Sequence, residues 1–183
     1  MRVLITGGCK NGKSFLAQRI AKAQGTPLYY VATMISTGRE DDERIRRHIR
    51  ERDGWGFATL EIGENIGRLP RLGDPNGSFL LDSATALLSN EMFSLDGHTD
   101  LQAGKKVERE LCEVVRALPN LVVVSDYIYS DAIMYDDMTN AYRKALGSIE
   151  CMLARECETV LEVCFGSTIV HKGKMPFLTD DIG

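Results

Sequence analysis

The sequence predicts an α/β fold in which a mainly parallel sheet carries helices on both faces. Short apolar runs alternate along the chain with longer segments of helical periodicity, as in sheets built from strand–helix–strand units. The middle runs are almost continuously apolar, which is expected for parallel strands covered on both faces. A glycine-rich loop joins the first expected strand to the first expected helix.

Six apolar runs are long enough to form strands of such a sheet. The expected strands are residues 2–6, 27–33, 78–82, 121–125, 159–165 and 167–171. The last two are separated by Gly166, which predicts a C-terminal antiparallel hairpin at one edge of the sheet. The expected helices are residues 14–24, 39–52, 84–93, 101–118 and 137–155.

Length and composition indicate one soluble globular domain. The 183 residues suit a single domain over 1–183, with a loop at the Pro- and Gly-rich stretch 70–77 and a loosely held tail at 175–183. Apolar residues make up 44% and charged residues 26%, which are ordinary proportions for such a protein. The formal net charge of −4 argues against nucleic acid as a partner.

Cysteine usage and hydropathy bear on the cellular compartment. The five cysteines are scattered without a C-x-x-C pair, which argues against a disulfide framework or a zinc site and indicates a reducing compartment. The chain has no apolar run of about eighteen residues, so we expect no membrane span. Together these features predict a cytoplasmic protein.

The glycine-rich loop has the spacing of a phosphate-binding loop. It matches G-x-x-x-x-G-K-[ST] at every fixed position, in the order Gly7, Gly8, Cys9, Lys10, Asn11, Gly12, Lys13 and Ser14. Such a loop turns backbone N–H groups inward and adds the positive end of the next helix, so all eight residues are predicted to bind nucleotide. Lys13 is expected to reach the β- and γ-phosphates, and Ser14 to hold Mg²⁺. The alternative is an ordinary Gly-rich turn, but the flanking strand and helix favour a P-loop NTPase-like (RecA-like) fold.

A second phosphate-site residue is expected at the end of another strand. The run 79–82 is apolar up to Asp82, and in phosphate-loop proteins such a strand lies beside the first one with its Asp directed at the metal. Asp82 could instead cap the following helix, because Asp is a common N-cap residue. Asp126, at the end of the strand 121–125, is a rival for the metal role.

The charged helix 39–52 carries a histidine between two arginines. Arg44, His48 and Arg52 are four residues apart and therefore share one face. Two guanidinium groups would keep the imidazole neutral and nucleophilic, and would also donate to phosphate oxygens. The alternative is a solvated face in which Glu and Arg side chains pair with each other.

Taken in order, these segments resemble the bifunctional adenosylcobinamide kinase / adenosylcobinamide-phosphate guanylyltransferase family of cobalamin biosynthesis. The family's loop G-G-x-x-x-G-K-S corresponds to residues 7–14, its Y-[IV]-A-T to residues 30–33 and its R-I-x-x-H to residues 44–48. Its Trp and T-x-E correspond to Trp55 and residues 59–61, and its L-L-[DE]-[CS]-x-T-x-x-x-[ST]-N to residues 80–90. The resemblance is close in the first half of the chain and weaker in the second.

The resemblance implies two reactions. A kinase step transfers the γ-phosphoryl group of ATP or GTP to the aminopropanol hydroxyl of adenosylcobinamide, and a second step transfers GMP from GTP to the resulting phosphate. In the family the GMP passes through a nucleotidyl-histidine, and the matching position is His48. The resemblance also implies a homotrimer, with catalytic roles for Lys13 and Arg44, nucleotide contacts from Thr33, Arg44, Glu61 and Asp82, and Mg²⁺ at Ser14 and Asp82.

The second half departs from the family in one segment. Where the family carries N-E-V-G-x-G-I-V-P, this chain has Ser-Asp-Tyr-Ile-Tyr-Ser-Asp over residues 125–131. The side chains of Tyr127, Tyr129 and Tyr135 could pack on a flat corrinoid, or they could be structural. The segment therefore leaves two alternatives open: a kinase with a single activity, and a non-catalytic nucleotide-binding regulator.

Overall fold

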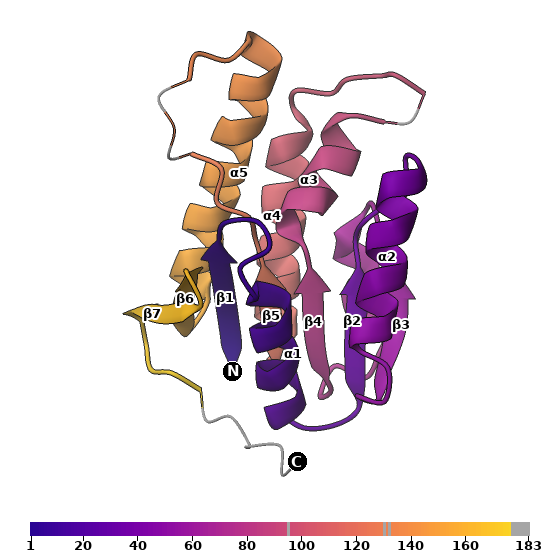
Figure 1. The fold of residues 1–183 in the computed structure, drawn as a ribbon, viewed down its shortest axis with the longest axis vertical. Helices are drawn as coiled ribbons and strands as arrows, with labels where there is room; N and C mark the ends of the chain where they lie inside the picture. Colours follow the sequence, from indigo (N-terminus) through magenta and orange to yellow (C-terminus); the bar gives the residue numbers. More distant parts are fainter. Residues whose placement is uncertain (95, 130, 132, 177–183) are drawn as a thin grey trace.

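One twisted sheet forms the centre of the molecule in the computed structural model (Figure 1). The structure describes residues 1–94, 96–129, 131 and 133–176, and within these ranges seven strands lie in the order β3-β2-β4-β5-β1-β6-β7. The strands are β1 (Arg2–Gly7), β2 (Leu28–Ala32), β3 (Phe57–Glu61), β4 (Ser78–Asp82), β5 (Leu121–Val124), β6 (Thr159–Cys164) and β7 (Ser167–Lys172). All neighbouring pairs are parallel except β6 and β7, which form the predicted antiparallel hairpin.

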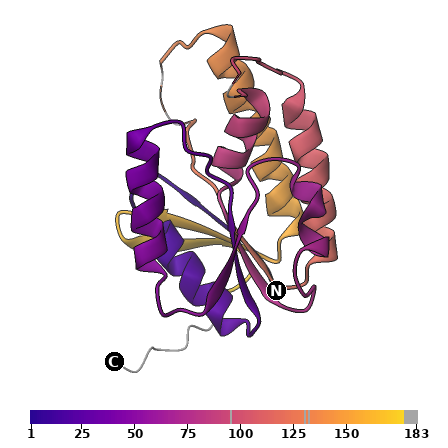
Figure 2. The ribbon, with the colours of Figure 1, turned by 90° about the vertical axis from the view of Figure 1, so that its right-hand side faces the viewer.

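Helices cover both faces of the sheet, as predicted (Figure 2). Two of them, α1 (Lys13–Ala23) and α2 (Arg39–Glu51), lie on one face. The other face is covered by α3 (Ala84–Met92), α4 (Ala103–Ala117), α5 (Asp137–Glu156) and the short 3-10 helix η1 (Ile66–Arg71). Because every parallel connection crosses a face, the loops that follow the strands gather at one edge of the sheet.

Two apolar cores explain why the central strands are continuously apolar. On the α1 face, Ala17 and Ile20 pack against Ile5 of β1 and other strand residues. On the opposite face, a larger cluster joins helices α3, α4 and α5 to the alternate residues of the same strands, including Leu4. Each central strand therefore buries both of its faces.

Two elements were not predicted from the sequence. Strand β3 is at the edge of the sheet and half-exposed, so it lacks the apolar run that identifies a central strand. The 3-10 helix includes Pro70 and Arg71, which the expected loop 70–77 had covered, and it is held by burial of Ile66 and Leu69. Most of the predicted tail, residues 177–183, lies outside the described residues.

The prediction that the Asp82 strand lies beside β1 is wrong. Strand β5 pairs with β4 on one side and with β1 on the other, so it separates the two. Local sequence patterns do not encode the order of parallel strands, because the crossover connections can reach either neighbour. The consequence is that Asp126, which follows β5, lies next to the phosphate loop.

Candidate nucleotide-binding site

The phosphate loop, residues 7–14, leaves the end of β1 in a conformation that requires glycine at two positions. Gly7 has φ +145°, and a Cβ atom there would lie 2.3 Å from the carbonyl oxygen of Val163 in β6. Gly12 has φ +93° and forms the left-handed N-cap of α1. The Asn11 side-chain amide donates to the same Val163 oxygen, so the loop is attached directly to β6.

Lys13 is the most buried charged side chain of the loop, at 5% exposure. Its ammonium group donates to the carbonyl oxygens of Gly7 and Gly8, at 3.0 and 2.5 Å. It also forms an ion pair with Asp126, 2.9 Å from Nζ to Oδ1. The lysine that the sequence assigns to the β- and γ-phosphates is therefore held inside the curve of the loop.

Asp126 is fixed beside the loop by backbone hydrogen bonds. Its N–H donates to Thr85 Oγ1 at 2.8 Å, and the next residue, Tyr127, donates its N–H to the Gly7 carbonyl at 3.1 Å. The Asp126 side chain is 22% exposed. The sequence offered a signal for this residue, because an apolar strand ending in Asp occurs both before Asp82 and before Asp126.

The remaining loop residues differ in exposure. Gly8, Cys9 and Lys10 are exposed at the turn of the loop, whereas Ser14 is half-buried as the second residue of α1. This arrangement leaves the outer turn open to a ligand and places the Ser14 hydroxyl at the positive end of the helix.

Asp82 belongs to a second group of side chains, which reaches from the sheet to α2. The Tyr30 hydroxyl donates to Asp82 Oδ2 at 2.9 Å. The Arg52 guanidinium, at the end of α2, lies over the Tyr30 ring, with Cζ 3.9 Å from the ring centroid. We call Tyr30, Asp82 and Arg52 the acidic-strand cluster. Tyr30 was not among the site residues predicted from the sequence.

His48 lies on the face of α2 that is turned toward the sheet. It precedes Arg52 by one helical turn, so the two share a face, and it is half-buried. Arg44, one turn earlier on this face, is exposed. Trp55, in the loop after α2, packs edge-on against Phe15 of α1, with ring centroids 5.8 Å apart. The two helices are thus joined at their surface.

Thr33 and Glu61, which were predicted to contact nucleotide, do not lie beside the phosphate loop. Thr33 is fully buried, and its hydroxyl donates to the Ser83 carbonyl at 2.8 Å and accepts from the Ser83 N–H at 2.7 Å. Thr33 therefore joins the ends of β2 and β4. Glu61 is exposed at the end of edge strand β3, four strand spacings from β1, or about 19 Å. Nucleotide contact by either residue stays a prediction.

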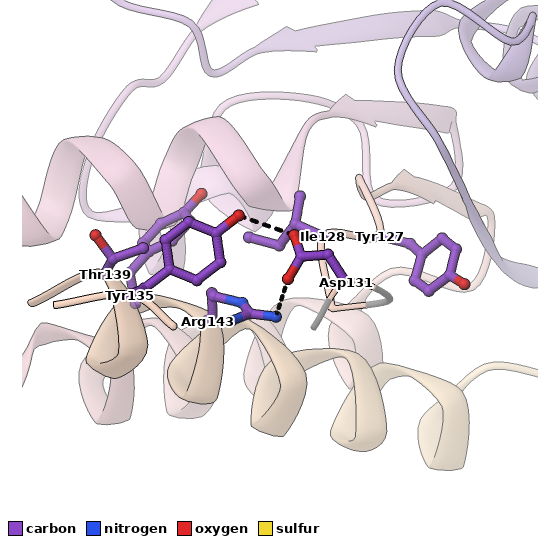
Figure 3. A pocket seen from close by; sticks show the side chains of 7 residues that line it. Tyr127, Ile128, Asp131, Tyr135, Thr139 and Arg143 are labelled. Atoms are coloured by element: carbon purple, nitrogen blue, oxygen red, sulfur yellow. Dashed lines mark hydrogen bonds and ion pairs between the residues drawn. The ribbon is translucent and has the colours of Figure 1, made fainter. Parts of the chain in front are cut away.

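A pocket of about 450 Å³ lies between the chain after β5 and helix α5 (Figure 3), and one of its lining residues, Tyr127, donates its N–H to Gly7 of the phosphate loop. Arg143 is central to it: its guanidinium pairs with Asp131 at 3.1 Å and lies over the Tyr135 ring, with Cζ 4.7 Å from the centroid. The Tyr135 hydroxyl donates to Asp131 at 2.8 Å. The lining residues are Tyr127, Ile128, Asp131, Tyr135, Thr139, Tyr142 and Arg143.

The three tyrosines after β5 divide into two roles. Tyr127 is exposed and lines the pocket together with Tyr135. Tyr129 instead packs into the large core, and burial raises the pKa of its hydroxyl. Tyr129 is therefore structural, and ligand contact by Tyr127 and Tyr135 stays a prediction.

A half-buried carboxyl group lies near the start of the loop. Glu150 of α5 accepts a long hydrogen bond from Thr6 Oγ1 of β1, at 3.5 Å. Burial raises the pKa of Glu150, and the nearby charge of Asp126 adds to this effect. The described residues contain no cluster of three or more metal-ligating His, Cys, Asp or Glu side chains. Any divalent ion at the loop would therefore depend on one or two protein ligands and the phosphates.

The loop, the strand order and the covering helices together define a phosphate-loop nucleotide-binding protein of RecA-like fold. The crystal structure of the RadB recombinase matches with a TM-score of 0.52 and 16% identity, over 97% of this chain and 83% of that chain. At this identity the match shows the fold alone. No helix among the described residues is long and apolar enough to cross a membrane.

The chain belongs to the cobinamide kinase / cobinamide phosphate guanyltransferase family, which it matches over residues 3–170. It is 29% identical over 176 residues to the bifunctional adenosylcobalamin biosynthesis protein CobP of Pseudomonas aeruginosa, covering 95% of this chain and 99% of that protein. It is 24% identical over 179 residues to the bifunctional protein CobU of Salmonella typhimurium, covering 91% and 97%. The match extends through the segment after β5 in which the sequence departs from the family motif.

Proposed function

We propose that this protein phosphorylates adenosylcobinamide with ATP or GTP and then transfers GMP from GTP to adenosylcobinamide phosphate. The observation that carries the proposal is the phosphate loop with its buried Lys13, in a chain whose family bears both activities in its name and whose relatives are named bifunctional adenosylcobalamin biosynthesis proteins. Both reactions displace a group at phosphorus in a triphosphate, so one loop can serve both.

In the kinase step, the loop binds the triphosphate through inward N–H groups and the N-terminus of α1. Lys13 turns from its carbonyl partners to the β- and γ-phosphates and stabilises the charge that develops as the γ-phosphoryl group leaves. The reaction breaks the bond between the γ-phosphorus and the bridging oxygen, and forms a bond to the acceptor oxygen.

In the guanylyl step, the His48 imidazole attacks the α-phosphorus of GTP, and pyrophosphate leaves. The phosphate of adenosylcobinamide phosphate then displaces the imidazole and receives the GMP. The half-buried position of His48 on the inner face of α2 supports this role, and exposed Arg44 on the same face can bind phosphate oxygens. The triphosphate would lie between the loop and α2, or reach α2 of a neighbouring subunit.

Magnesium fits the donor set that the chain offers. A serine hydroxyl at the loop and a carboxylate at a strand end are oxygen ligands of the kind that Mg²⁺ prefers, together with phosphate oxygens and water. Ser14 would bind the ion directly and Asp82, two strands away from β1, through water. Bound Mg²⁺ would neutralise charge on the triphosphate. Tyr30 holds one oxygen of Asp82 and so orients the carboxylate.

The pocket between the chain after β5 and α5 is the candidate acceptor site. It begins at Tyr127, whose N–H is bonded to the loop residue Gly7, so a ligand there lies next to the phosphates. Tyrosine faces suit a flat corrinoid. The Nε of Arg143 is buried and makes no hydrogen bond within the described chain, which leaves a donor for a polar group of the ligand.

Incubation with Mg²⁺ and GTP labelled at the α-phosphate tests the proposal. We expect acid-labile, alkali-stable GMP on the protein, its loss in His48→Ala, and its transfer to adenosylcobinamide phosphate. Label that survives in His48→Ala would remove the histidine mechanism. A monofunctional kinase predicts phosphoryl transfer without covalent nucleotide, and a non-catalytic regulator predicts binding without turnover; the names of the relatives favour neither. The trimer and the cytoplasmic location stay predictions.

A further inference from the structure

We propose that Asp126 is the catalytic base of the kinase step, accepting the proton of the acceptor hydroxyl. This inference rests on the proposed function and assigns a role within it. Asp126 is the carboxylate that the structure places between the phosphate loop and the candidate acceptor pocket, and the sequence marked it only as a rival metal ligand.

The position of Asp126 follows from contacts on both sides. Toward the loop, its Oδ1 lies 2.9 Å from Lys13 Nζ. Toward the pocket, it precedes the lining residue Tyr127, and its N–H is bonded to Thr85 Oγ1. The Thr85 carbonyl accepts a hydrogen bond at 3.0 Å from Tyr142, which also lines the pocket. Asp126 is thus linked to Lys13 of the loop on one side and, through the backbone and Thr85, to the lining residues Tyr127 and Tyr142 on the other.

Electrostatics agree with this placement. Burial raises the pKa of Tyr142, and the Asp126 carboxylate is the next largest cause. Its charge therefore acts on the wall of the pocket as well as on Lys13. At 22% exposure, the carboxylate remains accessible to a ligand.

The step balances without any further reactant. The acceptor O–H bond breaks, its proton moves to the Asp126 carboxylate, and the oxygen forms the new bond to the γ-phosphorus. The bond from that phosphorus to the bridging oxygen breaks, and the nucleoside diphosphate leaves with the electron pair. Lys13 exchanges Asp126 for the phosphates when nucleotide binds, which frees the carboxylate to accept the proton.

The two reactions differ in their need for this base, and that difference supplies the test. The kinase acceptor is an alcohol, which must lose a proton, whereas the acceptor of GMP is already an anionic phosphate. Asp126→Asn should lower kcat of the kinase step by roughly 10²–10⁴-fold. The rate at which GTP labels the protein with GMP should fall at least a hundredfold less.

The experiment uses the full-length protein with adenosylcobinamide, ATP and Mg²⁺, and measures kcat and KM of the kinase step separately. Asp126→Asn should lower kcat with little change in KM for adenosylcobinamide, and Asp126→Glu should keep more of kcat than Asp126→Asn does. Formate should restore part of the kinase rate in Asp126→Ala, which a structural role would not produce. Asp137→Asn, an exposed carboxylate in the first turn of α5, is the matched control and should match the unmodified protein.

Three outcomes would overturn the assignment. A kinase rate in Asp126→Asn within tenfold of the unmodified protein would exclude the base. Equal loss of both activities with a raised requirement for Mg²⁺ would make Asp126 a metal ligand. Equal loss with an unchanged Mg²⁺ requirement would reduce it to a partner of Lys13. Absence of kinase activity in the unmodified protein would instead contradict the proposed function, so the two failures are distinguishable.

Discussion

The phosphate loop and helix α2 are expected to act on the same triphosphate, yet they are built very differently. The loop leads into α1, which has five buried residues, and its Lys13 is bonded to the loop's own carbonyls. In α2 the residues with described side chains are half-buried or exposed. At its C-terminal end the Arg52 guanidinium lies over the Tyr30 ring and donates to Thr59, and just beyond it Trp55 packs on Phe15.

The difference indicates that the loop serves both reactions and that α2 serves one. A loop that is fixed in the core can bind phosphates in one geometry for both reactions. A helix held at its surface can be optimised for one reaction without disturbing that geometry. Changes in the loop should therefore affect both activities together, and changes around α2 should separate them.

The largest expected effect is that of Lys13→Ala. Both activities should fall by more than about 10³-fold, because the variant loses the cation that stabilises charge on the phosphates. Separate assays of γ-phosphoryl transfer and of protein labelling from GTP measure this. Retained labelling would mean that guanylylation uses a second nucleotide site. The phosphate loop would then not serve both reactions.

The next largest effect is expected for His48→Ala, which should abolish guanylyl transfer but not the kinase step. Label from GTP should disappear and GMP transfer should stop, because the nucleophile is lost. The kinase rate should change by less than about tenfold. Rates from both assays on the same preparation test this, with His98→Ala, an exposed histidine in the turn before α4, as the matched control.

Tyr30→Phe should have an intermediate effect. The ring that carries Arg52 is kept, whereas the hydroxyl that orients Asp82 is lost. Loss of one hydrogen bond to a charged group corresponds to about 1.5–3 kcal/mol, or roughly ten- to a hundredfold. We expect this loss in the apparent affinity for Mg²⁺ in both reactions. An unchanged Mg²⁺ dependence would show that Tyr30 does not position Asp82.

The smallest expected effect concerns Glu150, near the start of the loop. Burial raises the pKa of this carboxyl in the folded protein, so the folded state binds its proton more tightly than the unfolded state does. Its stabilising effect is present at low pH and is lost as pH rises from about 4.3, the value of a free Glu, through the raised value. Glu150→Gln should therefore melt a few degrees higher than the unmodified protein at pH about 8 and equally at pH about 4. Equal melting temperatures at both pH values would contradict this.

Much of the fold could be predicted because the central strands and helices have strong local patterns. The runs 78–82 and 121–125 and the helix 137–155 are apolar at nearly all of their buried positions, the exceptions being Ser78 and Ser125. Strand β3 was missed because an exposed edge strand has no such pattern, and the strand order was missed because pairing between distant strands is not encoded locally.

The site could be predicted in part for the same reason. The phosphate loop is a contiguous motif, so its residues and the requirement for glycine could be read from the chain. The ion pair between Lys13 and Asp126, and the contact of Tyr30 with Asp82, each join residues more than 50 positions apart. Only the folded sheet brings these residues together. Thr33 is the opposite case. The motif predicts a nucleotide contact for it, but in the fold its hydroxyl hydrogen-bonds to the backbone of Ser83.

The attachment of the loop to β6 has a consequence for how the protein is made. Asn11 and Gly7 lie against the Val163 carbonyl, which belongs to a strand 152 positions further along the chain and so leaves the ribosome much later than the loop. A nascent chain contains the glycine-rich motif early, but it lacks the β6 backbone against which the loop is fixed. We therefore expect nucleotide affinity to arise only after β6 has emerged and paired with β1.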